Sequence, residues 1–212
     1  MRCNMFKVVQ GKELRYCVYA HPDAQKEKLP LVVFLHGAGE RGDTLGETEL
    51  TLKIALPTLI TKKGMRPRCV IVCPQCEKET YWISDIQRTL RFIDEVEELY
   101  GTDPARVALT GVSMGGFGTW CTALTAPKRF FRIAPVCGGG MPWAAPMLQM
   151  PIRAFHGDAD TIVLPSCSID MVNGVKAGGN PNVSLTIYPG VGHNAWDYAY
   201  DESLMAFLLG EE

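Results

Sequence analysis

Short apolar runs alternate along the chain with segments in which apolar residues recur every three or four positions. Two runs near the start, residues 6–9 and 14–20, flank the polar stretch QGKE and predict a β-hairpin. Six further runs are rich in β-branched residues, and several are apolar without a break, which is typical of strands covered on both faces. These predicted strands span residues 31–36, 69–74, 106–111, 131–138, 152–157 and 183–190.

The segments between the predicted strands have helical periodicity. Residues Ile86, Leu90, Ile93, Val96 and Tyr100 recur at spacings of three and four, with charged residues between them, and predict one amphipathic helix. The other predicted helices span residues 49–63, 114–125, 166–177 and 196–209.

Strands that alternate with helices form a mostly parallel sheet with helices on both of its faces. No linker, internal repeat or low-complexity tract divides the chain, so we expect a single α/β domain over residues 1–212, without a large lid. Ligands bind such sheets beyond the carboxyl ends of the strands. Side chains that directly follow a strand are therefore the first candidates for catalytic or ligand-binding residues.

The composition excludes several functional classes. The chain has 21 basic and 23 acidic residues, whereas a nucleic-acid-binding protein has an excess of basic residues. No apolar run reaches the ~18 residues that cross a membrane. Charged residues also interrupt the N-terminal stretch MRCNMFKVVQGKELRY, where an export signal needs an apolar run. We therefore expect a cytoplasmic protein with no nucleic-acid partner and no membrane partner.

Ser113 is the first candidate for a reactive side chain. It is the central residue of GVSMG (111–115), between a predicted strand and a predicted helix. In a sharp strand-to-helix turn the serine is strained and raised above the sheet, and glycines are needed on either side because a Cβ would clash. The N-terminus of the following helix favours developing negative charge. This context predicts a nucleophile rather than an ordinary tight turn.

A serine nucleophile needs a base that accepts its proton. Among the four histidines, His193 is the best candidate, because it lies in a glycine-rich loop between the last predicted strand and the last predicted helix. His21 is expected on the surface. His36 and His156 each end a predicted strand, and both are expected to be buried and bonded to nearby backbone.

The base in turn needs a carboxylate that orients it. The stretch HGDADTIV (156–163) follows a predicted strand and offers two. Asp160 is preferred because it comes later in the loop, where Val163 and Leu164 can anchor the chain to the core. Asp158 is the alternative, although it is expected to form a turn with its own backbone.

Negative charge on a substrate oxygen needs hydrogen-bond donors as well. One donor is expected to be the backbone N–H of Met114, directly after the nucleophile. The other is expected from the glycine-rich stretch HGAGERG (36–42), where Ala38 is the first choice and Gly39 the second.

Two patterns that could bind a cofactor or a metal are incomplete. The stretch GAGERG (37–42) matches a dinucleotide-binding fingerprint, yet no acidic residue that could bind the ribose occurs between residues 50 and 76. His156, Asp158 and Asp160 have alternating spacing but lack a further histidine cluster. We expect no cofactor and no metal.

The chain contains eight cysteines. Four of them, Cys17, Cys69, Cys73 and Cys137, lie inside apolar runs and are expected to be buried apolar side chains rather than parts of disulfides. Cys73 and Cys76 have the spacing of a redox-active pair. Such a pair needs a helix N-terminus to lower the thiol pKa, and no clear helix follows here.

Taken together, these motifs resemble the α/β-hydrolase superfamily, and within it the small esterases related to phospholipase/carboxylesterase and dienelactone-hydrolase-like proteins. The matching stretches, from about residue 31 to 200, are LHGAGERG, Pro74-Gln75 followed by Trp82, DPARVALTGVSMGG, HGDADTIV and GVGHNAWDYAY. The resemblance implies hydrolysis of carboxylic esters or thioesters through an acyl-enzyme, without a cofactor. It transfers the roles of nucleophile, acid and base to Ser113, Asp160 and His193. It transfers the oxyanion donors to Ala38 and Met114.

The sequence says less about which residues bind the substrate. Trp82, Trp143 and Trp196 lie in segments that follow predicted strands, and we expect them near the cleft; for Trp196, packing beneath the last helix is the alternative. An open cleft without a lid fits short acyl groups or an exposed ester on a carbohydrate. The same residues also allow a thioesterase, a peptidase of the prolyl-oligopeptidase type, or a binding module without turnover. We expect no large gating domain of the kind that such peptidases usually carry, which disfavours the peptidase.

Overall fold

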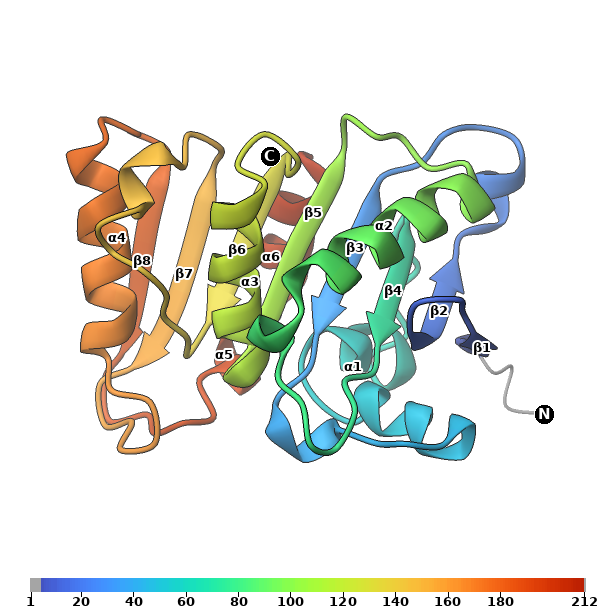
Figure 1. Cartoon of the computed structure of the whole chain (residues 1–212), viewed down its shortest axis with the longest axis horizontal. Helices are drawn as coiled ribbons and strands as arrows, with labels where there is room; N and C mark the ends of the chain where they lie inside the picture. The colour runs from blue at the N-terminus through green and yellow to red at the C-terminus, as the bar shows by residue number, and fades with distance from the viewer. Residues whose placement is uncertain (1–4, 212) are drawn as a thin grey trace.

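An eight-stranded sheet runs through the molecule, which the computed structural model describes for residues 5–211 (Figure 1). The strands are β1 (Lys7–Gln10), β2 (Arg15–Ala20), β3 (Leu31–Leu35), β4 (Val70–Pro74), β5 (Val107–Val112), β6 (Arg132–Val136), β7 (Ile152–Gly157) and β8 (Val183–Tyr188). Their order across the sheet is β1-β2-β4-β3-β5-β6-β7-β8. β2 is antiparallel to both of its neighbours, and the other neighbouring pairs are parallel. The predicted hairpin and the predicted parallel sheet are confirmed.

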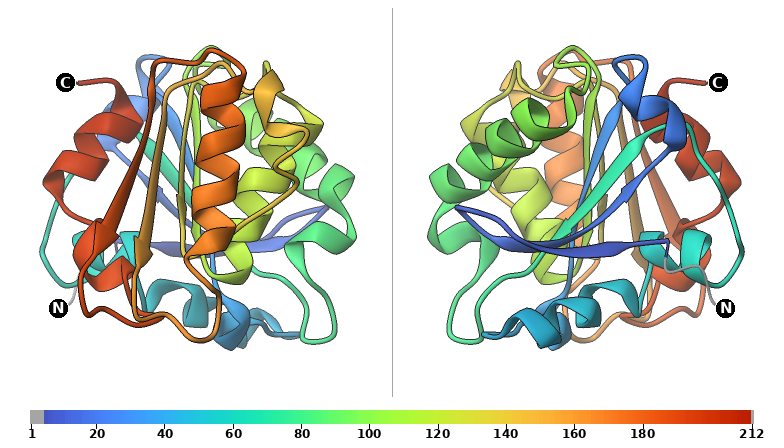
Figure 2. Two further views of the ribbon diagram at one scale, coloured as in Figure 1. Left: turned by 90° about the vertical axis from the view of Figure 1, so that its left-hand side faces the viewer. Right: turned by 90° about the vertical axis from the view of Figure 1, so that its right-hand side faces the viewer.

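Helices cover both faces of this sheet, as the edge-on views show (Figure 2). One face is covered by α2 (Ile86–Tyr100), α3 (Met114–Thr125) and α4 (Ser166–Ala177). The other face is covered by α1 (Leu56–Thr61), α5 (Trp196–Ala199) and α6 (Glu202–Leu209). Within residues 5–211, no helix has the length and apolarity needed to cross a bilayer.

The predicted helix over residues 86–100 is confirmed, and its ends have local causes. The Asp85 carboxylate accepts the Arg88 backbone N–H at 2.9 Å and caps the first turn of α2. Gly101 follows the last turn with a φ of 60°, a left-handed conformation that glycine adopts without strain. The bounds of α3 and α4 also agree with the predicted segments.

Two other predicted helices are each divided in the structure. Residues 49–63 were predicted as one helix, but a 3₁₀ helix ends at Leu52 and α1 begins only at Leu56, where Pro57 occupies its first turn. Residues 196–209 contain α5 and α6 instead of one helix. Asp201 caps α6 by accepting the Leu204 backbone N–H, and a cap of this kind favours a new helix start.

The strands in the middle of the sheet are buried on both faces. Every residue of β3, β4 and β5 is buried, which agrees with their uninterrupted apolar sequence. The thiols expected in the core are fully buried at Cys17, Cys69, Cys73 and Cys137. Because the parallel strands end at the same edge, the segments after β3, β5, β7 and β8 meet at the lower edge of Figure 1.

Candidate active site

Ser113 lies in the sharp turn between β5 and α3. Its backbone is strained, with φ 54° and ψ −116°. A Cβ added at Gly111 would lie 2.5 Å from the Gly115 carbonyl oxygen, and a Cβ at Gly115 would lie 1.9 Å from the Leu35 carbonyl oxygen. The Ser113 backbone N–H donates to the Val136 carbonyl at 2.9 Å. The glycines are therefore required by the close approach of α3 to the sheet.

His193 lies between Ser113 and Asp160. Its Nε2 is 2.8 Å from the Ser113 Oγ, and its Nδ1 is 2.7 Å from the Asp160 Oδ2. An ionised carboxylate only accepts hydrogen bonds, so Nδ1 carries the proton and Nε2 is left free to accept the serine hydroxyl. The structure thus brings together the three side chains that the sequence singled out, from the loops after β5, β7 and β8.

Asp160 is buried and receives donors on both oxygens. Its Oδ1 accepts the backbone N–H groups of Ile162 at 2.9 Å and Val163 at 3.0 Å, and its Oδ2 accepts His193. Burial alone would raise the pKa of this carboxyl group, but the hydrogen bonds from His193 and the two amides outweigh it and lower the pKa. Asp160 is therefore ionised at neutral pH.

The alternative carboxylate, Asp158, does not contact His193. Its Oδ1 accepts the Gly190 backbone N–H at 2.6 Å, so it ties the loop after β7 to the loop that carries His193. The expectation that Leu164 anchors this segment to the core is wrong, because Leu164 is 60% exposed. Hydrogen bonds from backbone amides, rather than apolar packing of Leu164, hold the loop around Asp160.

The predicted oxyanion donors border the same space. Met114 is the first residue of α3 and Ala38 the first of a 3₁₀ turn (Ala38–Glu40), so neither amide has a hydrogen-bond partner within its own helix. Both residues line the cleft at Ser113. Gly39, the second choice, is exposed in the same turn.

His36 supports the turn that carries Ala38. It is fully buried; its Nε2 accepts the Cys76 backbone N–H at 3.0 Å, and its Nδ1 donates to the Gly37 carbonyl at 2.5 Å. Burial lowers the pKa of His36 to about 4, so the ring is neutral. The indole N–H of Trp82 donates to the His36 carbonyl at 3.0 Å. As predicted, His36 is a buried histidine bonded to nearby backbone.

An apolar cleft of about 330 Å³ opens beside Ser113. Its lining consists almost entirely of apolar atoms, from Ala38, Tyr81, Trp82, Ile83, Ser113, Met114 and Phe117. Tyr81 and Ile83 are each 52% exposed and form its rim. The cleft can therefore hold an apolar group whose reacting atom lies at the Ser113 hydroxyl.

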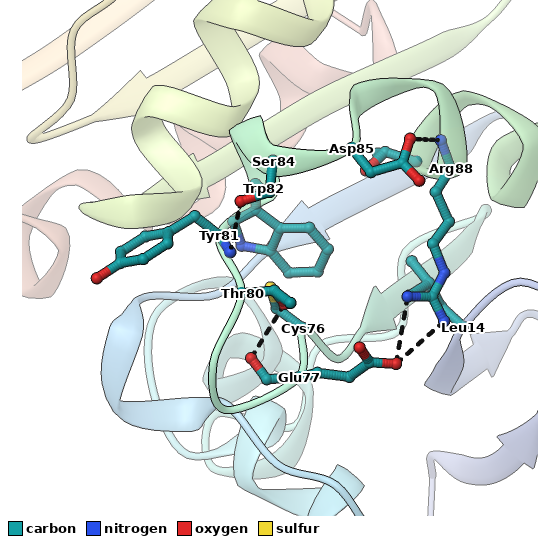
Figure 3. Close-up of a pocket in the computed structure, with 10 residues that line it drawn as sticks. Leu14, Cys76, Glu77, Thr80, Tyr81, Trp82, Ser84, Asp85 and Arg88 are labelled. Atoms are coloured by element: carbon teal, nitrogen blue, oxygen red, sulfur yellow. Dashed lines mark hydrogen bonds and ion pairs between the residues drawn. The ribbon is translucent and has the colours of Figure 1, made fainter.

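The wall formed by Tyr81 and Trp82 has a second side, shown in Figure 3. A cavity of about 60 Å³ is lined there by Trp82 and by Arg88 of α2. The Arg88 guanidinium donates to the Glu77 carboxylate at 3.2 Å and to the Glu13 carbonyl at 2.9 Å. These bonds tie the segment that carries Trp82 to α2 and to the N-terminal hairpin.

Comparison with known proteins gives the family. The model of the Esterase family, described as "Putative esterase", matches residues 10–176. The chain belongs to this esterase family.

Individual relatives of the chain agree with this assignment. The chain is 30% identical over 162 residues to the bifunctional acetylxylan esterase/xylanase XynS20E of Neocallimastix patriciarum, a match that covers 72% of this chain and 22% of that protein. The chain spans about a quarter or less of the length of the curated relatives it matches.

Solved structures of esterases share the fold of this chain. A thermostable esterase superposes with a TM-score of 0.78 at 25% identity, over 97% of this chain and 62% of that one. The feruloyl esterase module from Clostridium thermocellum superposes with a TM-score of 0.70 at 16% identity, over 92% and 84% of the two chains. The latter likeness concerns the fold alone.

The three tryptophans that were predicted to lie near the cleft are found in different places. Trp82 lines the cleft, and the Trp196 ring lies edge-on to the His193 ring with centroids 5.2 Å apart. Trp196 also packs against the core. Trp143 is not brought to the cleft: it is 79% exposed, and the carbonyl of the preceding Pro142 lies against Gly174 in the second half of α4. The loop after β6 turns back along α4, away from the edge that carries Ser113.

Three residues of the cleft were not predicted from the sequence. Tyr81 and Ile83 flank Trp82, so they could have been found once that tryptophan was placed at the cleft. Phe117 lies in the first turn of α3, which begins directly after Ser113, and both residues line the cleft.

One buried cluster of the described residues has the ligand atoms of a metal site. Atoms of Cys137, His156 and Asp160 lie within 4.8 Å of one another. However, the His156 Nε2 is 2.9 Å from the Val163 carbonyl oxygen, and two acceptors at this distance would repel each other unless Nε2 carried a proton. A metal ligand would have to lose that proton, so hydrogen bonding fits this arrangement better than metal binding.

The Cys73 and Cys76 thiols are both buried, and burial raises the pKa of each. Cys73 belongs to β4, and the Cys76 Sγ is 3.1 Å from the Thr80 Oγ1. Neither residue is at a helix N-terminus. Their environment is that of packed thiols rather than reactive ones.

Proposed function

We propose that this chain hydrolyses carboxylic esters through an acyl-enzyme formed on Ser113. The observation that carries the proposal is the hydrogen-bonded series from Ser113 through His193 to Asp160, next to an apolar cleft. Acyl transfer requires a nucleophile, a base whose free nitrogen faces the nucleophile, and an ionised carboxylate behind the base. Membership of the esterase family supports the same reaction.

The proposed reaction has two halves. His193 Nε2 accepts the hydroxyl proton as the Ser113 Oγ attacks the ester carbonyl carbon, while Asp160 stabilises the imidazolium ion. The amides of Met114 and Ala38 donate to the oxyanion. The intermediate then expels the alcohol, which takes the proton from His193 and leaves an acyl group on Ser113. A water molecule that gives a proton to His193 attacks this acyl group. The bond to the Ser113 Oγ then breaks, the Oγ takes the proton back from His193, and the carboxylic acid is released.

The apolar cleft beside Ser113 offers a binding surface for the acyl group of the ester. Its lining of Tyr81, Trp82, Ile83 and Phe117 presents aromatic and aliphatic surface next to Ser113, and half of the Tyr81 surface remains open to solvent. We propose that the acyl group enters this cleft while the alcohol lies on the open side toward Trp196. An open alcohol side allows a small molecule or an ester on a carbohydrate, and an acetylxylan esterase and a feruloyl esterase module are among the similar proteins.

The proposal is tested with p-nitrophenyl esters from acetate to decanoate, a matched p-nitroanilide, and a fluorophosphonate probe. We expect turnover of the esters and a single covalent adduct, which peptide mass spectrometry locates on Ser113. Faster turnover of the anilide than of the ester would instead favour the peptidase. A chain that neither reacts with the probe nor hydrolyses any ester would contradict the proposal and favour a binding module.

Replacement of Phe117 by alanine is expected to change acyl preference. Loss of the ring removes apolar contact from long or aromatic acyl groups but not from acetyl, so kcat/KM for octanoate should fall by roughly tenfold, with acetate little changed. Trp143→Ala is the matched control, because it removes an aromatic side chain that lies away from the cleft. An equal loss for acetate and octanoate would show that the acyl group does not lie against Phe117.

The sequence-based expectations of a cytoplasmic location and of no nucleic-acid partner stay predictions.

A further inference from the structure

A second histidine lies behind the Asp160 carboxylate. His156 is the fifth residue of β7, is fully buried, and precedes Asp160 by four positions. Its Nε2 is 2.9 Å from the Val163 carbonyl oxygen and 3.2 Å from the Asp160 Oδ2. On its other side, Nδ1 is 2.7 Å from the Ser168 Oγ, in the first turn of α4. Sequence reasoning expected contacts to nearby backbone, and the structure adds the two side-chain partners.

The partners of this ring decide where its proton lies. The Val163 carbonyl and the ionised Asp160 carboxylate are both acceptors, so the His156 Nε2 must be the donor. The Ser168 hydroxyl has one hydrogen, which either goes to Nδ1 or to the Gly138 carbonyl oxygen 2.9 Å away. In both cases the His156 Nε2 retains its proton, which it donates to the Val163 carbonyl oxygen, and the Asp160 Oδ2 lies 3.2 Å from the same nitrogen.

Asp160 Oδ2 therefore lies between two imidazole rings, and it accepts a hydrogen bond from His193. His193 approaches it from the cleft at 2.7 Å, and His156 approaches it from the interior at 3.2 Å. The backbone amides of Ile162 and Val163 occupy the other oxygen. A carboxylate that accepts hydrogen bonds on both oxygens, with the His156 ring against one of them, cannot rotate without leaving a buried polar atom unpaired.

We propose that His156 is a positioning residue, which holds the Asp160 carboxylate in the rotamer that orients His193 for proton transfer from Ser113. The proposal rests on the proposed ester hydrolysis. His156 touches neither substrate nor the serine, so its effect reaches the reaction through Asp160. Ser168 fixes the far side of the ring and links it to α4.

The neighbouring thiol is consistent with this assignment. Burial, and next the Asp160 carboxylate, raise the pKa of Cys137 to about 12. Cys137 is therefore a neutral thiol at the pH of catalysis, and it adds no second negative charge to the space behind Asp160. His156 is left as the side chain that supplies an N–H group from the interior.

Two replacements of His156 by residues with amide side chains distinguish the roles of the two ring nitrogens. The terminal amide of glutamine reaches the position of the imidazole Nε2, whereas the shorter asparagine reaches only the position of Nδ1. His156→Gln should therefore keep an N–H group at the position of Nε2, next to the Val163 carbonyl and Asp160, while His156→Asn should keep only the contact to Ser168. His156→Phe fills a similar volume with no donor at all.

The experiment measures kcat and KM for a p-nitrophenyl ester, the thermal unfolding midpoint, and the low-field proton signal of the His193–Asp160 hydrogen bond. We expect His156→Phe and His156→Asn to lose about 10- to 100-fold in kcat with KM little changed, because misplacement of a catalytic group acts on the reaction step. Their low-field signal should shift or broaden. His156→Gln should recover most of kcat and the original signal.

Equal kcat for the Gln and Asn variants would overturn the proposal, as would full activity of His156→Phe. If His156→Phe does not fold, the comparison of kcat between His156→Gln and His156→Asn still tests the proposed role of His156. The failure of ester hydrolysis itself would be seen separately, because the unchanged chain would then have no turnover that depends on Ser113.

Discussion

Replacement of Ser113 by alanine is expected to lower kcat for ester hydrolysis by ~10⁴-fold or more. The alanine keeps the space and the neighbouring amides but removes the oxygen that attacks the carbonyl carbon. The measurement is the initial rate with a p-nitrophenyl ester for both proteins, together with the thermal unfolding midpoint. An unchanged midpoint shows that the loss comes from chemistry rather than from unfolding.

Ser184→Ala is the matched control for this variant. Ser184 is an exposed residue of β8, so the same change there should leave the rate unaltered. A Ser113→Ala protein that keeps more than a few per cent of the rate would show that another residue attacks the ester, and the proposed mechanism would have to be abandoned.

Replacement of Asp160 by asparagine is expected to lower kcat by ~10⁴-fold. The asparagine is nearly isosteric, but its NH₂ group can face the His193 Nδ1, so that nitrogen becomes an acceptor and Nε2 takes the proton. Protonated Nε2 cannot accept the Ser113 hydroxyl hydrogen. The rate with a p-nitrophenyl ester, measured between pH 6 and 9, checks this expectation.

Asp158→Asn provides the comparison within the same loop. Its side-chain oxygen can still accept the Gly190 backbone N–H, so activity should remain within a few-fold of the original. A large loss at Asp158 combined with a small loss at Asp160 would reverse the roles of the two carboxylates.

The sequence predicted the parts of the site that depend on local geometry. Ser113 could be found because the turn that exposes it needs glycine at positions 111 and 115, and this requirement is visible as a motif. His193 could be found by elimination among four histidines. Asp160 was chosen over Asp158 by its place in the loop, and part of the reason given was wrong, because Leu164 is exposed.

The cleft could not be predicted in the same way, because its walls depend on how distant segments pack. Trp82 and Trp143 both follow strands, yet one lies beside Ser113 and the other lies along α4. Nothing in the local sequence shows that the loop after β6 turns back along a helix. The double contact of His156 likewise depends on Val163 and Ser168, which only the folded chain brings to it.

Because Ser113 lies in the middle of the sheet, the residues proposed to bind the acyl group lie mainly on one side of it and the residues proposed to transfer the proton lie on the other. The residues of the proposed acyl cleft come mainly from residues 38–83, on the β3 and β4 side, whereas Asp160 and His193 follow β7 and β8. An engineer could therefore diversify the loop after β4, which carries Tyr81, Trp82 and Ile83, to change which acids the proposed reaction releases, without touching proton transfer. The same division would let related enzymes acquire new specificities in one half of the molecule while the other half stayed unchanged.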